Sequence, residues 1–234
     1  MSNSPSNGIL EDFISLFYPR YCRGCLNSLA KGEELICTQC LLEMPKSYYH
    51  LQRDNPFFLK FRGRLPVKHV MALFKFVKES RVQQVLHALK YKQQPELGEM
   101  LGRVYGKDLF EAEYADSFDL IVPVPLHTSR RRIRGYNQSE EFGKGLSKIL
   151  DVPCDDTYMK RAARTETQTH KSKLSRWENV NRIFTVVDQS LIAGRRVLLV
   201  DDVVTTGATL EACGQALLNA GCRELSMACI AATQ

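Results

Sequence analysis

The clearest chemical pattern in this sequence is a pair of acids followed by a hydroxyl-rich loop. Asp201 and Asp202 come directly after Arg195 to Val200, an apolar run typical of a buried parallel strand. The segment Leu210 to Asn219 is predicted to form a helix that ends near Gly221. The loop between the acids and this helix contains Thr205, Thr206, Gly207, Ala208 and Thr209.

This arrangement has a defined chemistry. Ligands of open α/β sheets bind beyond the carboxyl ends of the strands. A loop that opens a helix offers free backbone N–H groups and the positive end of the helix dipole, and both suit a phosphate. Two carboxylates suit either sugar hydroxyls or Mg²⁺, which prefers oxygen ligands. Together these groups predict a site for a phosphorylated sugar; the alternative is an ordinary strand–turn–helix corner with an acidic N-cap.

The same run resembles the motif that binds phosphoribosyl diphosphate (PRPP) in type I phosphoribosyltransferases. The motif of that family is an apolar strand, an acidic pair and a loop of the form T-T/S-G-x-T. The resemblance implies that Asp201 and Asp202 hold the ribose 2′- and 3′-hydroxyls, and that residues 205–209 wrap the 5′-phosphate. It also implies that Mg²⁺ accompanies PRPP.

An arginine-rich segment follows another predicted strand, Leu120 to Pro125, and precedes a predicted helix from Asn137 to Leu150. Arginine matches phosphate oxygens bidentately, and glycine lets a backbone approach a ligand closely. The loop after this strand binds diphosphate in the phosphoribosyltransferase fold, so the segment is predicted to bind diphosphate or DNA; a solvated loop is the alternative. Its residues are Arg130, Arg131, Arg132, Arg134, Gly135, Tyr136, Asn137 and Gln138.

A second basic segment runs from Lys160 to Arg182, with seven Lys or Arg against two Glu. Few of its residues are core-seeking, so it is predicted to be a mobile flap. Such a flap could close over bound PRPP or lie along a nucleic-acid strand, and a solvated loop is again the alternative. Its candidate binding residues are Arg161, Arg164, Gln168, Lys173 and Arg176.

Half of the eight cysteines are spaced as metal ligands. Cys22, Cys25, Cys37 and Cys40 form a C-x2-C…x11…C-x2-C pattern. Four thiolates on two tight knuckles favour a closed, structural Zn²⁺ site. Two disulfides, unrelated free thiols or an iron–sulfur cluster are the alternatives. The other four cysteines lack ligand spacing and are predicted to be small buried hydrophobes: Cys154, Cys213, Cys222 and Cys229.

Composition limits the class of protein. With 44% hydrophobic and 25% charged residues, the 234-residue chain has an ordinary soluble globular composition. A net charge of +6 permits a polyanionic partner without requiring one. No apolar run reaches membrane-spanning length and the polar start lacks the features of a signal peptide, which predicts a cytoplasmic protein.

Strand and helix patterns alternate from residue 70 onward. They predict an α/β fold with a doubly wound, mostly parallel sheet of the type I phosphoribosyltransferase type. We expect a zinc-binding module at residues 1–50, a connector at 51–69 and the phosphoribosyltransferase-like domain at 70–234. The other expected elements are a short helix at Ile9 to Phe17, a strand at Met71 to Val77, a helix ending at Tyr91, a helix at Leu97 to Phe110, a short strand near Thr157 and a last strand at Glu224 to Ala231.

Four features occur in one order and together resemble the ComF family of bacterial competence proteins. Members of this family act in natural transformation, on or after the entry of single-stranded DNA into the cytoplasm. The Leu89-Lys-Tyr91 run also fits. The four features are the cysteine module, Val122-Pro-Val-Pro-Leu126 followed by Arg134-Gly-Tyr-Asn-Gln138, the Arg164-Thr-x-x-Gln168…Arg176-x-x-Asn179 stretch, and the acid–threonine loop.

The resemblance implies a competence protein that binds PRPP or a related phosphoribosyl ligand with Mg²⁺ and also engages single-stranded DNA. Proteins of the DNA-uptake machinery would be further partners. Exposed aromatic residues could stack on bases. The candidates, for each of which a place in the core is the favoured alternative, are Tyr48, Tyr49, Phe57 and Phe58. Two alternatives stay open: an active phosphoribosyltransferase with an unidentified nitrogen nucleophile, and a non-catalytic regulator that senses PRPP.

Overall fold

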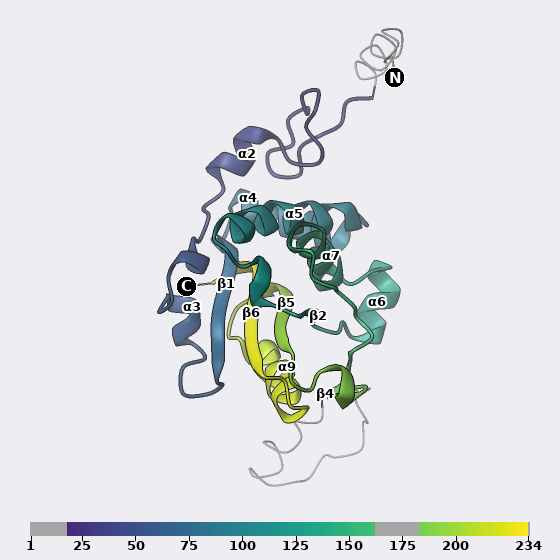
Figure 1. Cartoon of the computed structure of the whole chain (residues 1–234). Coiled ribbons are helices and arrows are strands. Elements are labelled where there is room, and N and C mark those ends of the chain that lie inside the picture. The colour runs from purple at the N-terminus through teal and green to yellow at the C-terminus, as the bar shows by residue number, and fades with distance from the viewer. Residues whose placement is uncertain (1–17, 162–182, 234) are drawn as a thin grey trace, which may run out of the picture.

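The fold is built on a sheet of four parallel strands. The computed structural model describes residues 18–161 and 183–233 (Figure 1). The strands lie in the order β1-β6-β5-β2 and all neighbouring pairs are parallel. They are β1 (Val67–Lys75), β6 (Glu224–Ala232), β5 (Arg196–Val204) and β2 (Leu120–Pro123). A sheet of this kind needs cover on both faces, which explains the continuous apolar runs.

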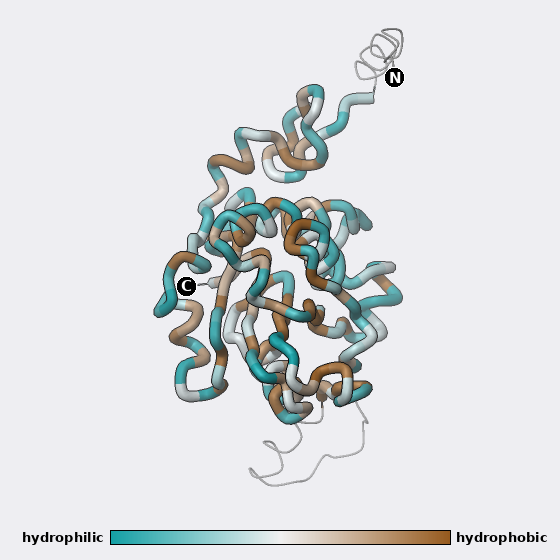
Figure 2. Tube along the Cα trace, viewed as in Figure 1, coloured by the Kyte–Doolittle hydropathy of each residue, from teal (hydrophilic) through white to brown (hydrophobic). Residues whose placement is uncertain are grey.

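Successive residues of β5 point to opposite faces of the sheet, and each face has its own core. Leu198 and Val200 belong to one core, and Val197 and Leu199 belong to the other. The first core is covered by α4 (Arg81–Tyr91), α5 (Pro95–Glu111) and α7 (Gln138–Leu150), and the second by α3 (Pro56–Leu59) and α9 (Ala208–Asn219). Helices therefore cover both faces, as Figure 1 shows, and apolar residues gather on the central strands in Figure 2. This confirms the predicted doubly wound α/β fold.

Helices α5 and α7 pack with their backbones in close contact. A Cβ atom on Gly102 would lie 2.2 Å from the carbonyl oxygen of Phe142, and one on Gly145 would lie 2.1 Å from that of Glu99. Carbonyl groups inside helices cannot move aside, so only glycine fits at these two positions. The contact fixes the position of α7 over the sheet, and with it the first turn of α7.

Residues 46–55, which span the end of the expected zinc module and the start of the expected connector, lie along the outer edge of β1. The backbone N–H of Ser47 donates to the carbonyl of Leu73 at 2.9 Å. Further along, the Asn55 side chain caps α3 and donates to the carbonyl of Val70 at 2.9 Å. These bonds satisfy an edge that would otherwise offer unpaired backbone groups.

Residues 18–44 form a small module with one short helix, α2 (Thr38–Glu43). Arg103 of α5 forms an ion pair with Glu34 of this module at 2.5 Å. Arg81, the first residue of α4, forms another with Glu43. The module therefore contacts the same helical layer that covers one face of the sheet.

The arginine-rich segment contains a helix, α6 (Thr128–Arg134), where we expected a loop. The Nδ1 atom of His127 accepts a hydrogen bond from the N–H of Ser129 at 3.3 Å and caps this helix. Gly135 ends it in the left-handed region, with φ of 81°. None of the residues of α6 is buried, so no apolar periodicity marks the helix in the sequence.

A two-stranded antiparallel ribbon, β3 (Met159–Arg161) and β4 (Phe184–Val186), flanks the second basic segment. The guanidinium of Arg161 lies 5.3 Å from the centroid of the Phe184 ring.

Outside the described residues lie the helix predicted at Ile9 to Phe17 and the other flap positions, Arg164, Gln168, Lys173 and Arg176. Three short 3₁₀ turns complete the fold: η1 (Tyr49–Leu51), η2 (Ala115–Ser117) and η3 (Gln189–Leu191). Within the described ranges, no helix has both the length and the apolar character needed to cross a membrane.

Candidate functional site

The acid pair lies within β5, toward its C-terminal end. We expected the strand to end at Val200, but its pairing with β6 continues to Val204, opposite Ala232. Strand β2, on the other side of β5, ends opposite Val200. The part of β5 that contains Asp201 and Asp202 is therefore paired with β6 on one side. On its other side the pairing with β2 has already ended.

Asp201 is half-buried and strongly perturbed. Its Oδ1 atom accepts hydrogen bonds from Ser139 Oγ at 2.9 Å and from the backbone N–H of Asp202 at 2.8 Å. Burial and the neighbouring Asp202 carboxylate raise the pKa of Asp201 from 3.8 to about 7. Lys90 Nζ lies 3.0 Å from Asp202 Oδ2 and brings a positive charge to the pair.

The threonine loop after the acids has an exposed face. Gly207 adopts φ of 81°, a left-handed conformation that favours glycine, and α9 begins at the next residue. The first N–H groups of a helix have no partner within that helix. That of Ala208 donates to Thr206 Oγ1 at 3.4 Å, and those that follow it are available to an anion. The exposed residues of this loop and turn are Thr205, Thr206, Ala208 and Thr209.

Two residues that the sequence did not reveal hold this loop from behind. Lys60 Nζ donates to the carbonyl of Thr205 at 3.1 Å and to that of Thr233 at 2.7 Å. A Cβ atom on Gly207 would lie 2.8 Å from the buried ring of Phe61, so the ring also fixes the glycine. These contacts join residues far apart in the chain, and local sequence patterns carry no signal for them.

The predicted diphosphate loop divides into two parts: Arg130 to Arg134 lie on α6, and Gly135 to Gln138 run from the end of α6 into α7. The hydroxyl of Tyr136 donates to the carbonyl of Leu89. Asn137 caps α7 and donates to the carbonyl of Val124 at 3.0 Å. Gln138 is only 1% exposed. Tyr136 and Asn137 therefore link α4 and α7 to the loop after β2, and Gln138 accepts a hydrogen bond from Arg134. The role of the segment in binding a ligand stays a prediction.

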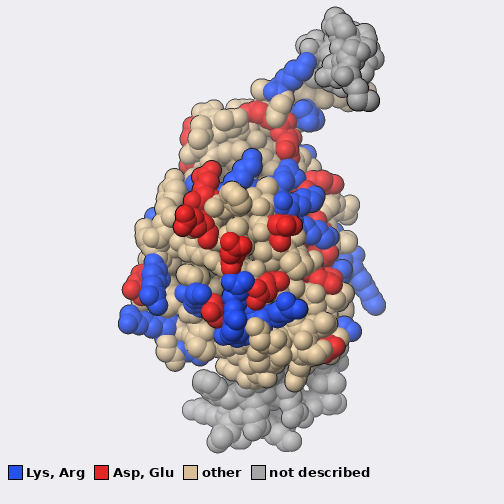
Figure 3. Space-filling view, viewed as in Figure 1, with Lys and Arg blue, Asp and Glu red and all other residues tan. Residues whose placement is uncertain are grey.

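The arginines of α6 differ in whether acidic side chains neutralise their charges. Arg131 forms ion pairs with Asp156 at 2.7 Å and with Glu140 at 3.6 Å. Arg130 and Arg132 are exposed and form no ion pair with a described residue. On the face that Figure 3 shows, basic side chains lie among acidic ones, so the net charge alone does not define a binding surface.

The aromatic residues considered for base stacking are mostly in the core. Tyr49 and Phe57 are buried, and Phe58 is half-buried. Tyr48 is 52% exposed. Of these four side chains, Tyr48 is the one most accessible to a base.

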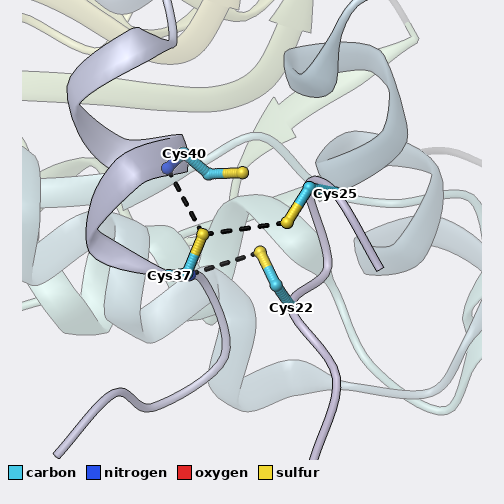
Figure 4. A group of neighbouring side chains, drawn as sticks. All are labelled: Cys22, Cys25, Cys37 and Cys40. Carbon is cyan, nitrogen blue, oxygen red and sulfur yellow. Dashed lines mark hydrogen bonds between the residues drawn. The ribbon is translucent and has the colours of Figure 1, made fainter. Parts of the chain in front are cut away.

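The four spaced cysteines converge on one point, as Figure 4 shows. Their Sγ atoms all lie within 4.8 Å of one another, and those of Cys25 and Cys37 are 3.8 Å apart. Four Zn–S bonds of about 2.3 Å in a tetrahedron require sulfur–sulfur distances of about 3.8 Å. All eight cysteines are free thiols, which rules out the two-disulfide alternative in this structure. The cluster could therefore hold a metal ion.

The backbone around Cys22 favours its thiolate. The N–H groups of Gly24 and Cys37 donate to Cys22 Sγ at 3.3 and 3.2 Å. Burial raises the pKa of Cys22, but these and other backbone N–H groups outweigh it and lower the pKa to about 6. Donation of N–H groups to sulfur stabilises the thiolate that a metal requires. The remaining cysteines lie elsewhere, with Cys213, Cys222 and Cys229 buried and Cys154 half-buried.

Comparison with known proteins defines the class first. Residues 137–234 match the family model described as a phosphoribosyl transferase domain. The parallel sheet, and the acid pair followed by the threonine loop, agree with this match. The C-terminal part is therefore a phosphoribosyltransferase-type domain. One similar solved structure is a glutamine PRPP amidotransferase from B. subtilis, with a TM-score of 0.45 and 19% identity, covering 62% of this chain and 30% of that chain.

Relatives that match most of the chain then narrow the class. Competence protein F of Haemophilus influenzae is 29% identical over 217 residues, covering 88% of this chain and 93% of its own. DNA utilization protein YhgH of Escherichia coli K12 is 27% identical over 215 residues, covering 91% and 90%. Competence protein ComFC of Bacillus subtilis is 26% identical over 203 residues, covering 86% and 79%. The resemblance to the ComF family is thus confirmed, and the chain is a homologue of these competence and DNA-utilization proteins.

The perturbed Asp201 carboxyl gives a pH prediction. Its pKa is raised from 3.8 to about 7 in the folded protein, so the unfolded chain releases this proton first as pH rises. The free energy of unfolding should therefore fall between about pH 4 and pH 7. Asp201→Asn removes the titrating group and with it this loss of stability. Between pH 4.5 and pH 8, the melting temperature of the wild type should therefore fall relative to that of the variant. Scanning calorimetry without ligand measures both.

The exposed residue Asp54 provides the control. Asp54→Asn should shift the melting temperature by the same small amount at both pH values. Parallel pH profiles of the wild type and Asp201→Asn would contradict the assignment of the perturbed group.

Proposed function

We propose that this protein is a cytoplasmic ComF-type competence protein. Its phosphoribosyltransferase-like domain binds PRPP or a related phosphoribosyl ligand with Mg²⁺, and the protein also engages incoming single-stranded DNA. The observation that carries the ligand is the half-buried acid pair near the C-terminal end of β5, two residues before an exposed threonine loop that opens α9. The DNA activity is supported by relatives named for competence and DNA utilization.

The chemistry of the site suits each part of such a ligand. The N–H groups at the start of α9 and the hydroxyls of Thr205 and Thr206 would bind the 5′-phosphate. Asp201 and Asp202 would accept hydrogen bonds from the ribose hydroxyls, because a carboxylate oxygen is a strong acceptor of O–H donors. Mg²⁺ would neutralise the diphosphate, and carboxylate and phosphate oxygens are the ligands that it prefers.

For the cysteine cluster we infer a structural Zn²⁺. Four thiolates close the tetrahedral coordination and leave no open position for a substrate. Residues 18–44 contain one short helix and a small core, so metal binding would supply much of their folding free energy.

The first prediction concerns the ligand. Wild-type protein with PRPP and Mg²⁺ at about a hundred times the dissociation constant should be stabilised by about 2.7 kcal/mol. The double variant Asp201→Asn/Asp202→Asn should lose this stabilisation, since it removes both charged acceptors, as measured by thermal unfolding with and without PRPP. Asp54→Asn is the matched control and should keep it. An unchanged ligand-induced shift in the double variant would overturn the assignment.

The same preparation separates binding from group transfer. When PRPP, Mg²⁺ and candidate amines or bases are added, release of diphosphate identifies an active phosphoribosyltransferase. Tight binding of PRPP without release, together with binding of single-stranded DNA, identifies the competence protein proposed here. Binding of PRPP alone identifies the regulator.

The second prediction concerns the metal. Purified protein should contain one equivalent of zinc per chain, and Cys25→Ser should lose most of it because one thiolate of the closed set is missing. Elemental analysis measures both, and Cys154→Ser, outside the cluster, should retain the full equivalent. Iron with absorbance in the visible range would identify the iron–sulfur alternative instead.

The third prediction concerns DNA. Arg130 and Arg132 are better probes than Arg131, whose charge is compensated by Asp156 and Glu140. Arg130→Ala/Arg132→Ala should weaken binding to single-stranded DNA and reduce the slope of log affinity against log salt by about 1.4, or about 0.7 for each lost contact. Fluorescence anisotropy over a salt series measures this slope.

A control with the same loss of charge is Arg53→Ala/Lys107→Ala, at two other exposed positions. Its slope should equal that of the wild type. If the Arg130/Arg132 variant also keeps the wild-type slope, α6 is not part of the DNA-binding surface.

A further inference from the structure

We propose that Lys90 binds the diphosphate of the phosphoribosyl ligand while it keeps its contact with Asp202. This inference rests on the proposed function, because it names a further ligand-binding residue of the same site. Lys90 lies in the last turn of α4, outside both segments in which the sequence suggested phosphate-binding residues. The argument starts from its contact with the acid pair.

The contact joins two distant parts of the chain. Lys90 Nζ lies 3.0 Å from Asp202 Oδ2, and the two side chains are only 25% and 14% exposed. The lysine stem is therefore mostly covered, and the ammonium group is held at the carboxyl edge of the sheet. Partial burial also reduces screening by salt, so this charge acts more strongly on a bound anion than a fully exposed one.

The residues on both sides of Lys90 contact the Arg134–Gln138 segment. The carbonyl of Leu89 accepts the hydroxyl of Tyr136, and the guanidinium of Arg134 lies 5.4 Å from the centroid of the Tyr91 ring. These contacts position the end of α4 against the loop that opens α7. A surface ion pair contributes little to stability and would not need this support, whereas a ligand-binding charge must be preorganised.

The ammonium group has donors to spare. It carries three N–H donors and no acceptor, and its contact is the ion pair with Asp202. In PRPP the diphosphate is attached to C1, next to the C2 hydroxyl that the acid pair would hold. A cation that contacts Asp202 is therefore beside the group that carries most of the ligand's negative charge, and it can bridge the carboxylate and a phosphate oxygen.

The nearby arginines do not supply this charge equally well. Arg131 already forms ion pairs with two acids, and Arg134 lies over the Tyr91 ring and bonds to Gln138 at 2.7 Å. Lys90, by contrast, also contributes directly to the electrostatic environment of Asp201. Its charge is the one placed against the acid pair in this part of the fold.

The test compares two probes that differ in the diphosphate group. Isothermal titration calorimetry of the full chain with Mg²⁺ measures the affinities for PRPP and for ribose 5-phosphate. Lys90→Gln keeps an amide donor for Asp202 but removes the charge, and Lys90→Arg retains the charge. Lys90→Met is a second neutral variant, and Lys92→Gln, at an exposed position two residues further on, is the matched control.

We expect Lys90→Gln and Lys90→Met to weaken PRPP binding by at least about tenfold, as for the loss of one charged hydrogen bond. Affinity for ribose 5-phosphate should change by less than about twofold, and Lys90→Arg and Lys92→Gln should bind PRPP nearly as the wild type does. Melting temperatures without ligand verify that each variant is folded.

The outcomes separate this inference from the proposed function. If the neutral variants weaken both ligands equally, or weaken neither, Lys90 has only a structural contact with Asp202 and the inference is overturned while the proposed function stands. If the wild type binds neither PRPP nor ribose 5-phosphate, the proposed function fails and the role of Lys90 fails with it.

Discussion

The site depends on one electrostatic constraint, which is the presence of two adjacent carboxylates at the end of a central strand. Neighbouring acids in a half-buried place repel one another, and burial raises the pKa of Asp201 to about 7. Two donors from different elements compensate them: Ser139 of α7 bonds to Asp201, and Lys90 of α4 pairs with Asp202. Much of the surrounding packing serves to bring these two side chains to the strand.

That packing forms a continuous path through one layer of the molecule. The close contact of α5 and α7 at Gly102 and Gly145 fixes where α7 lies over the sheet, and thereby the position of Ser139. Tyr136 then joins the start of α7 to the end of α4, next to Lys90. At its other end, α4 begins with Arg81, which pairs with Glu43 of the cysteine module. The helix that supplies Lys90 therefore touches the module at one end and the acid pair at the other.

The sequence predicted the parts of the site that are contiguous in the chain. The acid pair, the threonine loop and the cysteine spacing could be found because each depends on neighbouring residues or on a short fixed separation. The helix α6 was missed because it buries no side chain, so its arginines show no periodicity. Lys60 and Phe61 were missed because they lie in an apparent connector and reach the threonine loop only through tertiary contacts.

The sequence by itself determined the alternating α/β pattern, the cysteine cluster and the acid–threonine corner, since buried strands and local motifs are specified by nearby residue types. Only the tertiary structure decided which residues surround the acids. It joined Tyr136 to Leu89 and Asn137 to Val124 by hydrogen bonds, and it brought Lys90 to Asp202. The physical reason is that ion pairs and hydrogen bonds depend on distances in space, which the packing of α4 and α7 on the sheet determines.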